Sequence, residues 1–419
     1  MDESQLARRP GEDMCLFHSK DEKKPVAEFR AALAAKKASG DGNYVGFVFP
    51  EWADFSVVTF TGDADFGEAN FTGAAHFFRA TFTGDANFGE ANFTGAADFW
   101  GATFTGDANF FRATFTGDAD FWGANFTGAA HFWGARLDGP GRVVFQGDEE
   151  KTVFHGRADF RGAYFGTVLF RSVHLKDATF AGCYGLEKVE FDNVTWGSID
   201  QPWRDWPLAR RLLRWRRENV VGDELEARKT RKEGDFAVAE GVYFTPGAEQ
   251  GFAAAERVYR MLRKSYKDRE DYAGAREFYF GQMEMRRLAR KGWRKWLSLT
   301  TAFWLLSGYG TRWRRAAGWA VLLLLLWALL YAFSGLRLAS DPPGVAHTLA
   351  LWGGTGAFFW DGLRIIGYGL IHSLEATIVR TDFARPAHNW GWLFQTVQNA
   401  LGPTIIAMLV LAIREQFKK

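Results

Sequence analysis

The sequence predicts a multi-domain β + α membrane protein, in which a repetitive β-solenoid precedes a helical hairpin and a transmembrane helical hairpin. Phe recurs at alternating intervals of five and six residues, amphipathic helical periodicity follows, and two apolar stretches lie near the end of the chain. We divide the chain into an N-terminal capping helix region (1–43), the solenoid (44–200), a basic linker with the helical hairpin (201–295) and the membrane domain (296–419).

The spacing of Phe between residues 49 and 132 predicts the solenoid. Intervals of five and six residues form an eleven-residue unit, and two units give a turn of twenty-two residues. Phe66, Phe88 and Phe110 then stack in one interior ladder, with neighbouring turns about 4.8 Å apart. Ala stands two residues before nearly every Phe and shares the interior, because alternate residues of an extended chain face the same way.

The segments ADFGE, ANFTG, ADFWG and ANFFR resemble the pentapeptide-repeat family, whose unit reads A-(D/N)-F-x-x. The resemblance implies a right-handed quadrilateral β-helix and indicates almost nothing about function. An extra residue follows every second unit, and we expect the corners of the coil to absorb it. The pattern predicts roughly seven turns. Upstream, residues 15–42 predict one amphipathic helix that covers the first turn.

Aromatic residues also occupy outward positions of the predicted solenoid. Phe78, Trp100 and Trp122 are twenty-two residues apart and stack on one outer face, whereas Phe111 and Trp133 stack on the opposite face. Contiguous exposed aromatic side chains are typical of a covered surface. We therefore expect a contact with a subunit, a domain, an unknown protein or a small-molecule ligand; mere tolerance of exposed rings is the alternative.

Charge is divided unevenly along the chain. Residues 44–200 contain 10 Lys/Arg against 21 Asp/Glu, whereas residues 201–419 contain 33 against 20. Residues 203–217 interleave Arg with Trp and Leu, which predicts a basic helix at a membrane surface or, as the alternative, at a nucleic acid. We expect no nucleic-acid partner. An acidic solenoid is also compatible with DNA mimicry, but a membrane anchor is an unusual companion for a DNA mimic.

Helical periodicity returns in residues 249–293. Apolar residues recur at helical spacing on both sides of a turn in DREDYAGA, which predicts a helical hairpin. The pattern resembles a tetratricopeptide-like helix pair, and such pairs serve as spacers or docking elements.

Two apolar stretches predict the membrane hairpin. Residues 316–334 carry no charge, and residues 390–413 form the second stretch. Lys and Arg crowd before the first stretch and after the second, so the positive-inside rule places the solenoid and both termini in the cytoplasm of a multi-pass inner-membrane protein. The Gly-rich segment between the two stretches contains charged residues and predicts a re-entrant or interfacial segment.

The order of span, short segment and span resembles two-transmembrane ion channels of the potassium-channel type, and the whole chain resembles relatives that join a pentapeptide-repeat rod to such a pore domain. This resemblance implies a homo-oligomer in a lipid bilayer, with a tetramer expected. The sequence SLEATIVRTDFARP stands where that family has its T-x-G-Y-G-D filter, so we do not expect potassium selectivity. The candidate pore-mouth residues are Ser373, Glu375, Thr377, Thr381 and Asp382.

The second apolar stretch carries a polar stripe. Gln395, Gln398, Asn399 and Gly402 follow the spacing i, i+3, i+4, i+7. Amides in hydrocarbon are costly unless they face a partner or water. The stripe therefore predicts either a pore lining or a hydrogen-bonded helix–helix interface without a lumen, and the sequence does not choose between them.

The sequence contains no H-E-x-x-H, G-x-S-x-G or G-x-x-x-x-G-K-[ST] motif and only two cysteines. We expect no enzyme, no cofactor and no metal site. These patterns together predict an oligomeric membrane channel-like protein whose cytosolic solenoid is a sensor, binding or assembly module. The alternative is a membrane-anchored scaffold whose solenoid is a protein-docking surface, with no conduction.

Overall fold

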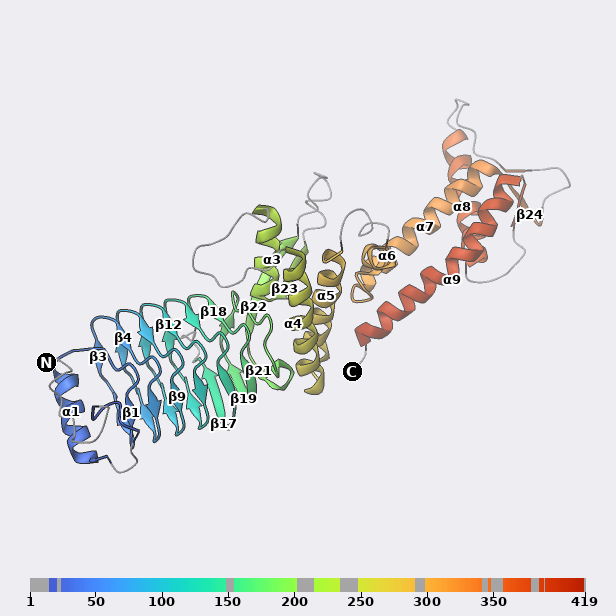
Figure 1. Cartoon of the computed structure of the whole chain (residues 1–419). Coiled ribbons are helices and arrows are strands. Elements are labelled where there is room, and N and C mark those ends of the chain that lie inside the picture. Colours follow the sequence, from blue (N-terminus) through green and yellow to red (C-terminus); the bar gives the residue numbers. More distant parts are fainter. Residues whose placement is uncertain are drawn as a thin grey trace. The chain divides into compact units, whose positions relative to one another are not determined.

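The computed structural model describes residues 15–20, 24–147, 154–201, 215–233, 248–290, 298–340, 346–347, 357–377, 384–387 and 389–417. Its contacts divide the chain into two compact units, Met1–Lys291 and Gly292–Lys419. Figure 1 follows the chain from the strands of the first unit to the helices of the second. Each unit is described by itself.

The first unit contains a β-solenoid whose short strands recur in four columns, so each turn has four sides (Figure 1). Strands within a column pair in parallel with a shift of one turn, as in Ala64↔Ala86 and Asp65↔Asn87. One column comprises β1 (Val48–Phe49), β5 (Asn70–Phe71), β9 (Asn92–Phe93) and β13 (Thr114–Phe115), and the next comprises β2 (Ala53–Asp54), β6 (Ala75–His76), β10 (Ala97–Asp98) and β14 (Ala119–Asp120). The others comprise β3 (Thr59–Phe60), β7 (Thr81–Phe82), β11 (Thr103–Phe104) and β15 (Asn125–Phe126), and β4 (Ala64–Asp65), β8 (Ala86–Asn87), β12 (Ala108–Asn109) and β16 (Ala130–His131).

The interior of the solenoid is filled by the predicted Phe ladders. The ring centroids of Phe66 and Phe88 lie 5.0 Å apart and those of Phe88 and Phe110 lie 4.9 Å apart, with nearly parallel planes. Within a turn the rings meet edge-on, as Phe66 and Phe77 do at 87°. The Ala residues that precede the rings are also buried. The twenty-two-residue turn and its inward Phe and Ala positions are therefore confirmed.

Glycine stands where successive turns approach most closely. A β-carbon on Gly106 would lie 2.6 Å from the carbonyl oxygen of Gly84, and one on Gly128 would lie 2.3 Å from that of Gly106. Real β-carbons essentially never approach backbone atoms this closely, so any other residue at these corners would force the neighbouring backbone to shift. Gly62, at the start of the same column, has open space around it.

The extra residue of every second unit lies at these corners, as predicted, and where it is Asp it has a structural role. The Asp63 carboxylate accepts a hydrogen bond from the backbone N–H of Asp85 at 2.9 Å, and the Asp85 carboxylate accepts one from Asp107 at 2.9 Å. Asp107 continues the series to the N–H of Ala129. Each of these carboxylates therefore ties its own turn to the next one.

The structure supports about six turns, where roughly seven were predicted. The later turns depart from twenty-two residues: Phe132 stacks on Phe160, twenty-eight residues later, and Phe160 stacks on Phe180, twenty residues later. Strand β17 pairs with β19 with a register shift between Leu137 and Arg142. The later strands are β17 (Arg136–Gln146), β18 (Ala158–Asp159), β19 (Tyr164–Arg171), β20 (His174–Leu175), β21 (Glu190–Asp192), β22 (Thr195–Gln201) and β23 (Trp215–Val220), with the 3-10 helix η2 (Leu186–Lys188).

The N-terminal end of the solenoid is covered as expected, but by a shorter helix. Helix α1 (Val26–Ala38) begins after Pro25, a residue favoured at helix starts and unable to continue a helix from upstream. Phe29 of α1 meets Phe49 edge-on at 5.7 Å. Phe17, which precedes the helix, stacks on Phe47 at 4.3 Å. The cap is therefore a turn plus a helix rather than one continuous helix.

Three helices cover the other end of the solenoid: α3 (Gly222–Glu233), α4 (Ala248–Asp268) and α5 (Tyr272–Leu288) (Figure 1). Helices α4 and α5 form the predicted hairpin. The indole N–H of Trp196 in the last turn donates to the Tyr266 hydroxyl of α4 at 3.0 Å. The basic helix expected at 203–217 is wrong for its last residues, because Trp215–Val220 is strand β23, paired antiparallel with β22. Residues 202–214 lie outside the described residues.

The second unit contains α6 (Leu299–Ser307), α7 (Trp313–Ser334), α8 (Ala357–Thr377), α9 (Asn389–Phe417), β24 (Leu336–Leu338) and β25 (Ala384–Pro386). Helices α7, α8 and α9 contact one another. Within the segment expected to be re-entrant, α8 is a continuous helix. Among the described helices, the single stretch long and apolar enough to cross a membrane is Arg314–Ser334, of which 28% is buried. The second predicted span, in α9, does not meet this criterion over its described residues, so the transmembrane hairpin stays a prediction.

Replacing Gly106 by Ala should destabilise the solenoid by about 1–3 kcal/mol, because the new β-carbon would overlap the backbone of Gly84. Thermal or urea unfolding of the full chain measures the change. Gly62→Ala is the matched control and should be nearly neutral, because nothing lies within 4 Å of its added β-carbon. Equal effects of the two substitutions would contradict the close-packed corners.

Candidate functional site

Polar side chains of three helices meet inside the second unit. The side-chain nitrogen of Gln398 on α9 lies 2.8 Å from the Ser373 carbonyl oxygen, 2.9 Å from its hydroxyl and 2.7 Å from the Thr377 hydroxyl. The Gln398 oxygen accepts a hydrogen bond from the Tyr331 hydroxyl of α7 at 2.8 Å. Gln398 and Ser373 are buried. The Gln398 amide is therefore fully hydrogen-bonded within one copy of the chain.

The other members of the polar stripe are placed differently. Gly402 is buried against the same turn of α8, where an added β-carbon would lie 3.3 Å from a Thr377 methyl group. Asn399 is exposed. Gln395 is half-buried, and its side-chain oxygen has no hydrogen-bond partner among the described residues. The stripe is thus divided between a helix–helix contact and an outer surface.

The candidate pore-mouth residues are also divided. Ser373 and Thr377 lie in the cluster around Gln398. Glu375 pairs with His372 one helical turn earlier, at 3.8 Å, and both side chains are largely buried. Thr381 and Asp382 lie outside the described residues. All the described candidates belong to the last turns of α8, so they lie on a helix.

The outward aromatic residues of the solenoid form two short ladders, as predicted. On one side, the ring centroids of Phe78 and Trp100 are 5.0 Å apart and those of Trp100 and Trp122 are 5.7 Å apart. On the other side, the rings of Phe111 and Trp133 lie 5.2 Å apart. Trp100 is 40% exposed and Trp122 is 43% exposed, which leaves them accessible to a ligand. The use of either ladder as a contact surface stays a prediction.

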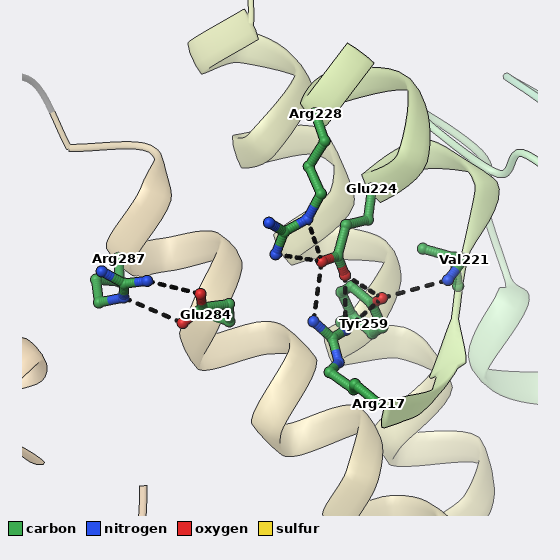
Figure 2. Close-up of polar contacts among 7 residues, drawn as sticks. All are labelled: Arg217, Val221, Glu224, Arg228, Tyr259, Glu284 and Arg287. Carbon is green, nitrogen blue, oxygen red and sulfur yellow. Dashed lines mark hydrogen bonds and ion pairs between the residues drawn. The ribbon is translucent and has the colours of Figure 1, made fainter. Parts of the chain in front are cut away.

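A buried polar network that the sequence did not predict joins β23, α3 and α4 (Figure 2). The Arg217 guanidinium donates to both oxygens of the Glu224 carboxylate, at 2.9 and 2.6 Å, and to the Tyr259 hydroxyl at 2.6 Å. Tyr259 in turn donates to Glu224 at 2.5 Å, and Arg228 adds a contact at 2.7 Å. Burial alone would raise the pKa of Glu224, but the charges of Arg217 and Arg228 hold that pKa below its ordinary value.

This network is structural rather than catalytic. Arg217 is 2% exposed and Glu224 and Tyr259 are 0% exposed, so no substrate reaches them. Removing one member of such a buried pair leaves the other charge buried without a partner, which typically lowers the free energy of unfolding by about 3–5 kcal/mol. Figure 2 also shows a separate ion pair on α5, in which Arg287 donates to Glu284 at 2.7 and 3.1 Å.

Asp223, beside this network, fastens α3 to the last turn of the solenoid. Its two carboxylate oxygens accept hydrogen bonds from the backbone N–H groups of Phe180 and Ala181, both at 2.8 Å. Burial is the main reason that the pKa of Asp223 rises from 3.8 to about 7, and the nearby charge of Glu226 adds to the rise. The end of the solenoid is therefore closed by a titratable group.

The sequence contains one local indication of the buried network around Glu224. Glu224 and Arg228 are four residues apart, a spacing that predicts an ion pair on one helix face. The partners Arg217 and Tyr259 come from other elements, and their spacing in sequence carries no such signal.

The described residues contain no group of three or more His, Cys, Asp or Glu side chains that could hold a metal ion. Cys15 and His18 lie close to each other, with 2.9 Å between Sγ and Nδ1, but two ligands are fewer than the three or more that define such a site.

Asp223 should make stability depend on pH. Between about pH 4 and 7 the unfolded chain has released this proton while the folded chain keeps it, so the free energy of unfolding should fall as pH rises, by up to ~1.4 kcal/mol per pH unit, and level off above pH 7. Asp223→Asn lacks the titrating group. The difference in the free energy of unfolding between wild type and variant should therefore shrink as pH rises. Urea unfolding at a series of pH values measures this difference. A difference that grows with pH would contradict the raised pKa.

A family model described as pentapeptide repeats, with nine copies of the unit, matches residues 88–136. No curated protein and no solved structure matches the chain. The matched segment contains Trp100, Phe111, Trp122 and Trp133 and lies entirely within the four-sided coil. The chain therefore contains a pentapeptide-repeat β-solenoid.

Proposed function

We propose that this protein is a membrane-anchored docking scaffold. Its pentapeptide-repeat solenoid presents a binding surface on the cytosolic side, and its C-terminal helices hold that surface at the inner membrane.

The exposed apolar surface of α7 is the observation that carries the proposal. Val321, Leu322, Leu325 and Leu326 are 57%, 54%, 50% and 48% exposed. They belong to the stretch Arg314–Ser334, which is long and apolar enough to cross a bilayer. A row of half-exposed leucines on one helix is unfavourable in water and suits contact with lipid.

Two further features fit a helical unit at a bilayer. Trp390 and Trp392, at the start of α9, are 68% and 52% exposed, and Trp is enriched at membrane–water interfaces. Arg312, Arg314 and Arg315 lie at the start of α7, where the positive-inside rule expects cationic residues on the cytoplasmic side.

The hydrogen bonds of Gln398 favour an anchor over a pore. An amide in hydrocarbon needs a partner, and Gln398 has Ser373, Thr377 and Tyr331 within its own chain. The most buried residue of the polar stripe therefore requires neither a water-filled lumen nor a second copy.

An oligomeric channel is the second candidate, and Asn399 is the observation in its favour. Asn399 is exposed, and the neighbouring Gln395 oxygen has no partner among the described residues. In a bilayer these amides would gain from facing a shared axis or another subunit.

Membrane association tests the anchor. The wild-type protein should stay in the membrane fraction through an alkaline wash and dissolve in detergent. Leu322→Asp with Leu326→Asp should shift most of it to the soluble fraction, since each Asp near a helix centre opposes insertion by about 3 kcal/mol. Val45→Asp with Tyr184→Asp is the control, because both residues are exposed on the solenoid. Wild-type protein that washes off the membrane would refute the anchor.

Oligomeric state and conductance separate the two candidates. A scaffold should show no conductance in planar bilayers, and Asn399→Leu should leave its mass in detergent unchanged. A tetramer that conducts, and loses conductance on Asn399→Leu but not on Thr404→Val, would replace the scaffold by the channel. Thr404 is the matched control because it is an exposed polar residue on the same helix.

A further inference from the structure

We propose that the face formed by Phe78, Trp100 and Trp122, here called the aromatic face, binds a cationic segment of a partner protein. Lys or Arg side chains would lie over the rings and pair with the carboxylates of Asp98 and Asp120. The inference rests on the proposed docking function, and it specifies that the docked segment of the partner is cationic.

The rings of the aromatic face form an open platform. Their centroids are spaced by 5.0 and 5.7 Å along three successive turns, and both indoles are at least 40% exposed. Trp provides the strongest cation–π attraction among the aromatic side chains. An extended peptide that runs along the solenoid would pass several rings in succession.

Carboxylates flank the rings. Asp98 of β10 pairs in register with Asp120 of β14, so the two acidic side chains stand one turn apart on this face. Asp98 accepts a hydrogen bond from the backbone N–H of Trp100 at 3.0 Å, and Asp120 accepts one from Trp122 at 2.8 Å. Each carboxylate is thus fixed beside the indole two residues later.

These carboxylates lack a strong counter-charge. The imidazole of His76 lies 3.9 Å from Asp98, and no ion pair involves Asp120 among the described residues. Partial burial and the neighbouring Asp98 both raise the pKa of Asp120 above its ordinary value. A bound guanidinium or ammonium group would offset the repulsion between the carboxylates of Asp98 and Asp120.

The solenoid already places one cation on this face. The Arg79 guanidinium lies 5.4 Å from the centroid of the Phe78 ring. The corresponding corners of the next two turns are Gly101 and Gly123, which have positive φ and no side chain. The Arg79 side chain runs beside Gly101, where an added β-carbon would lie 3.2 Å from Arg79 Cγ. Gly101 and Gly123 themselves supply no cation over Trp100 and Trp122, so a partner's cation can take that role.

The opposite face does not offer the same chemistry. Beside Phe111 and Trp133 the strand residues are Asn109 and His131 rather than Asp. Arg112 of the chain itself lies 4.9 Å from the Phe111 ring and pairs with Glu90 at 3.7 Å. Charge complementarity therefore favours the aromatic face, and the opposite face serves as an internal control.

Fluorescence anisotropy with a labelled oligoarginine peptide tests the proposal on the full chain in detergent micelles. Trp100→Ala with Trp122→Ala should weaken binding about tenfold, and the two Phe substitutions at these positions should restore part of it. Asp98→Asn with Asp120→Asn should weaken binding by a similar factor and reduce its dependence on salt. Thermal unfolding checks that each variant is folded.

Two matched controls separate this face from the general acidity of the solenoid. Glu68→Gln with Glu90→Gln removes the same charge from exposed corners elsewhere, and Phe111→Ala removes a ring from the opposite face. Both should bind the peptide like wild type. Equal losses in the controls, or no loss in the Trp100/Trp122 variant, would overturn the proposal.

Self-association is the competing outcome for the same surface. If the Trp100/Trp122 variant changes the oligomeric state while peptide binding stays as in wild type, the face is a contact between copies and the proposal fails. Membrane fractionation is read independently. Protein that stays on the membrane but does not bind the peptide refutes only the cationic partner, whereas peptide binding by protein that washes off the membrane refutes only the anchor.

Discussion

The axial spacing between neighbouring strands, about 4.8 Å, is the constraint on which the solenoid depends. It sets the distance between stacked rings, as in the 4.9 Å between Phe88 and Phe110. Parallel stacking alone is not the best arrangement of two rings, but Phe88 also meets Phe99 of the same coil edge-on at 89°. The same spacing excludes β-carbons at the corners. The same spacing also stacks outward residues that occupy equivalent positions of successive turns. An indole or a carboxylate that recurs at one position therefore forms a ladder.

A solenoid built this way exposes its core at both ends, and the two ends are closed differently. The N-terminal end is closed by apolar contacts of Phe17 and Phe29. The C-terminal end is closed by apolar contacts, such as that between Trp196 and Phe278, and in addition by polar groups with fixed geometry. These polar groups include Asp223 on two backbone amides and the Arg217–Glu224 pair behind it. Apolar contacts tolerate small displacements, whereas buried ion pairs do not. The helical hairpin is therefore held in one orientation on the last turn.

The repeat could be read from the sequence because its information is local: each Phe and Ala occurs at a fixed interval. The number of turns could not, because the turns after Phe132 depart from twenty-two residues without an obvious signal in the sequence. The buried position of Arg217 on β23 could not be predicted either, because its partners, Glu224 and Tyr259, come from separate elements.

The polar stripe shows a similar limit. The spacing in sequence puts Gln398 and Asn399 on one stripe, yet successive helix residues point about 100° apart. Gln398 meets α8 and Asn399 is exposed. Periodicity gave the spacing of these residues but not the direction from which a neighbouring helix approaches.

The Asp ladder at the corners has a consequence for how this molecule can change in length. Asp63, Asp85 and Asp107 each bind the backbone of the following turn, and the Phe ladders and Gly corners repeat with the same period. Within the regular turns, loss or duplication of one whole turn would therefore join equivalent atoms and leave both caps untouched, whereas a change of a few residues there would interrupt all three series. The regular part of the solenoid can thus be lengthened or shortened most simply by whole turns, and irregular turns such as that from Phe132 to Phe160 fall outside the Asp ladder.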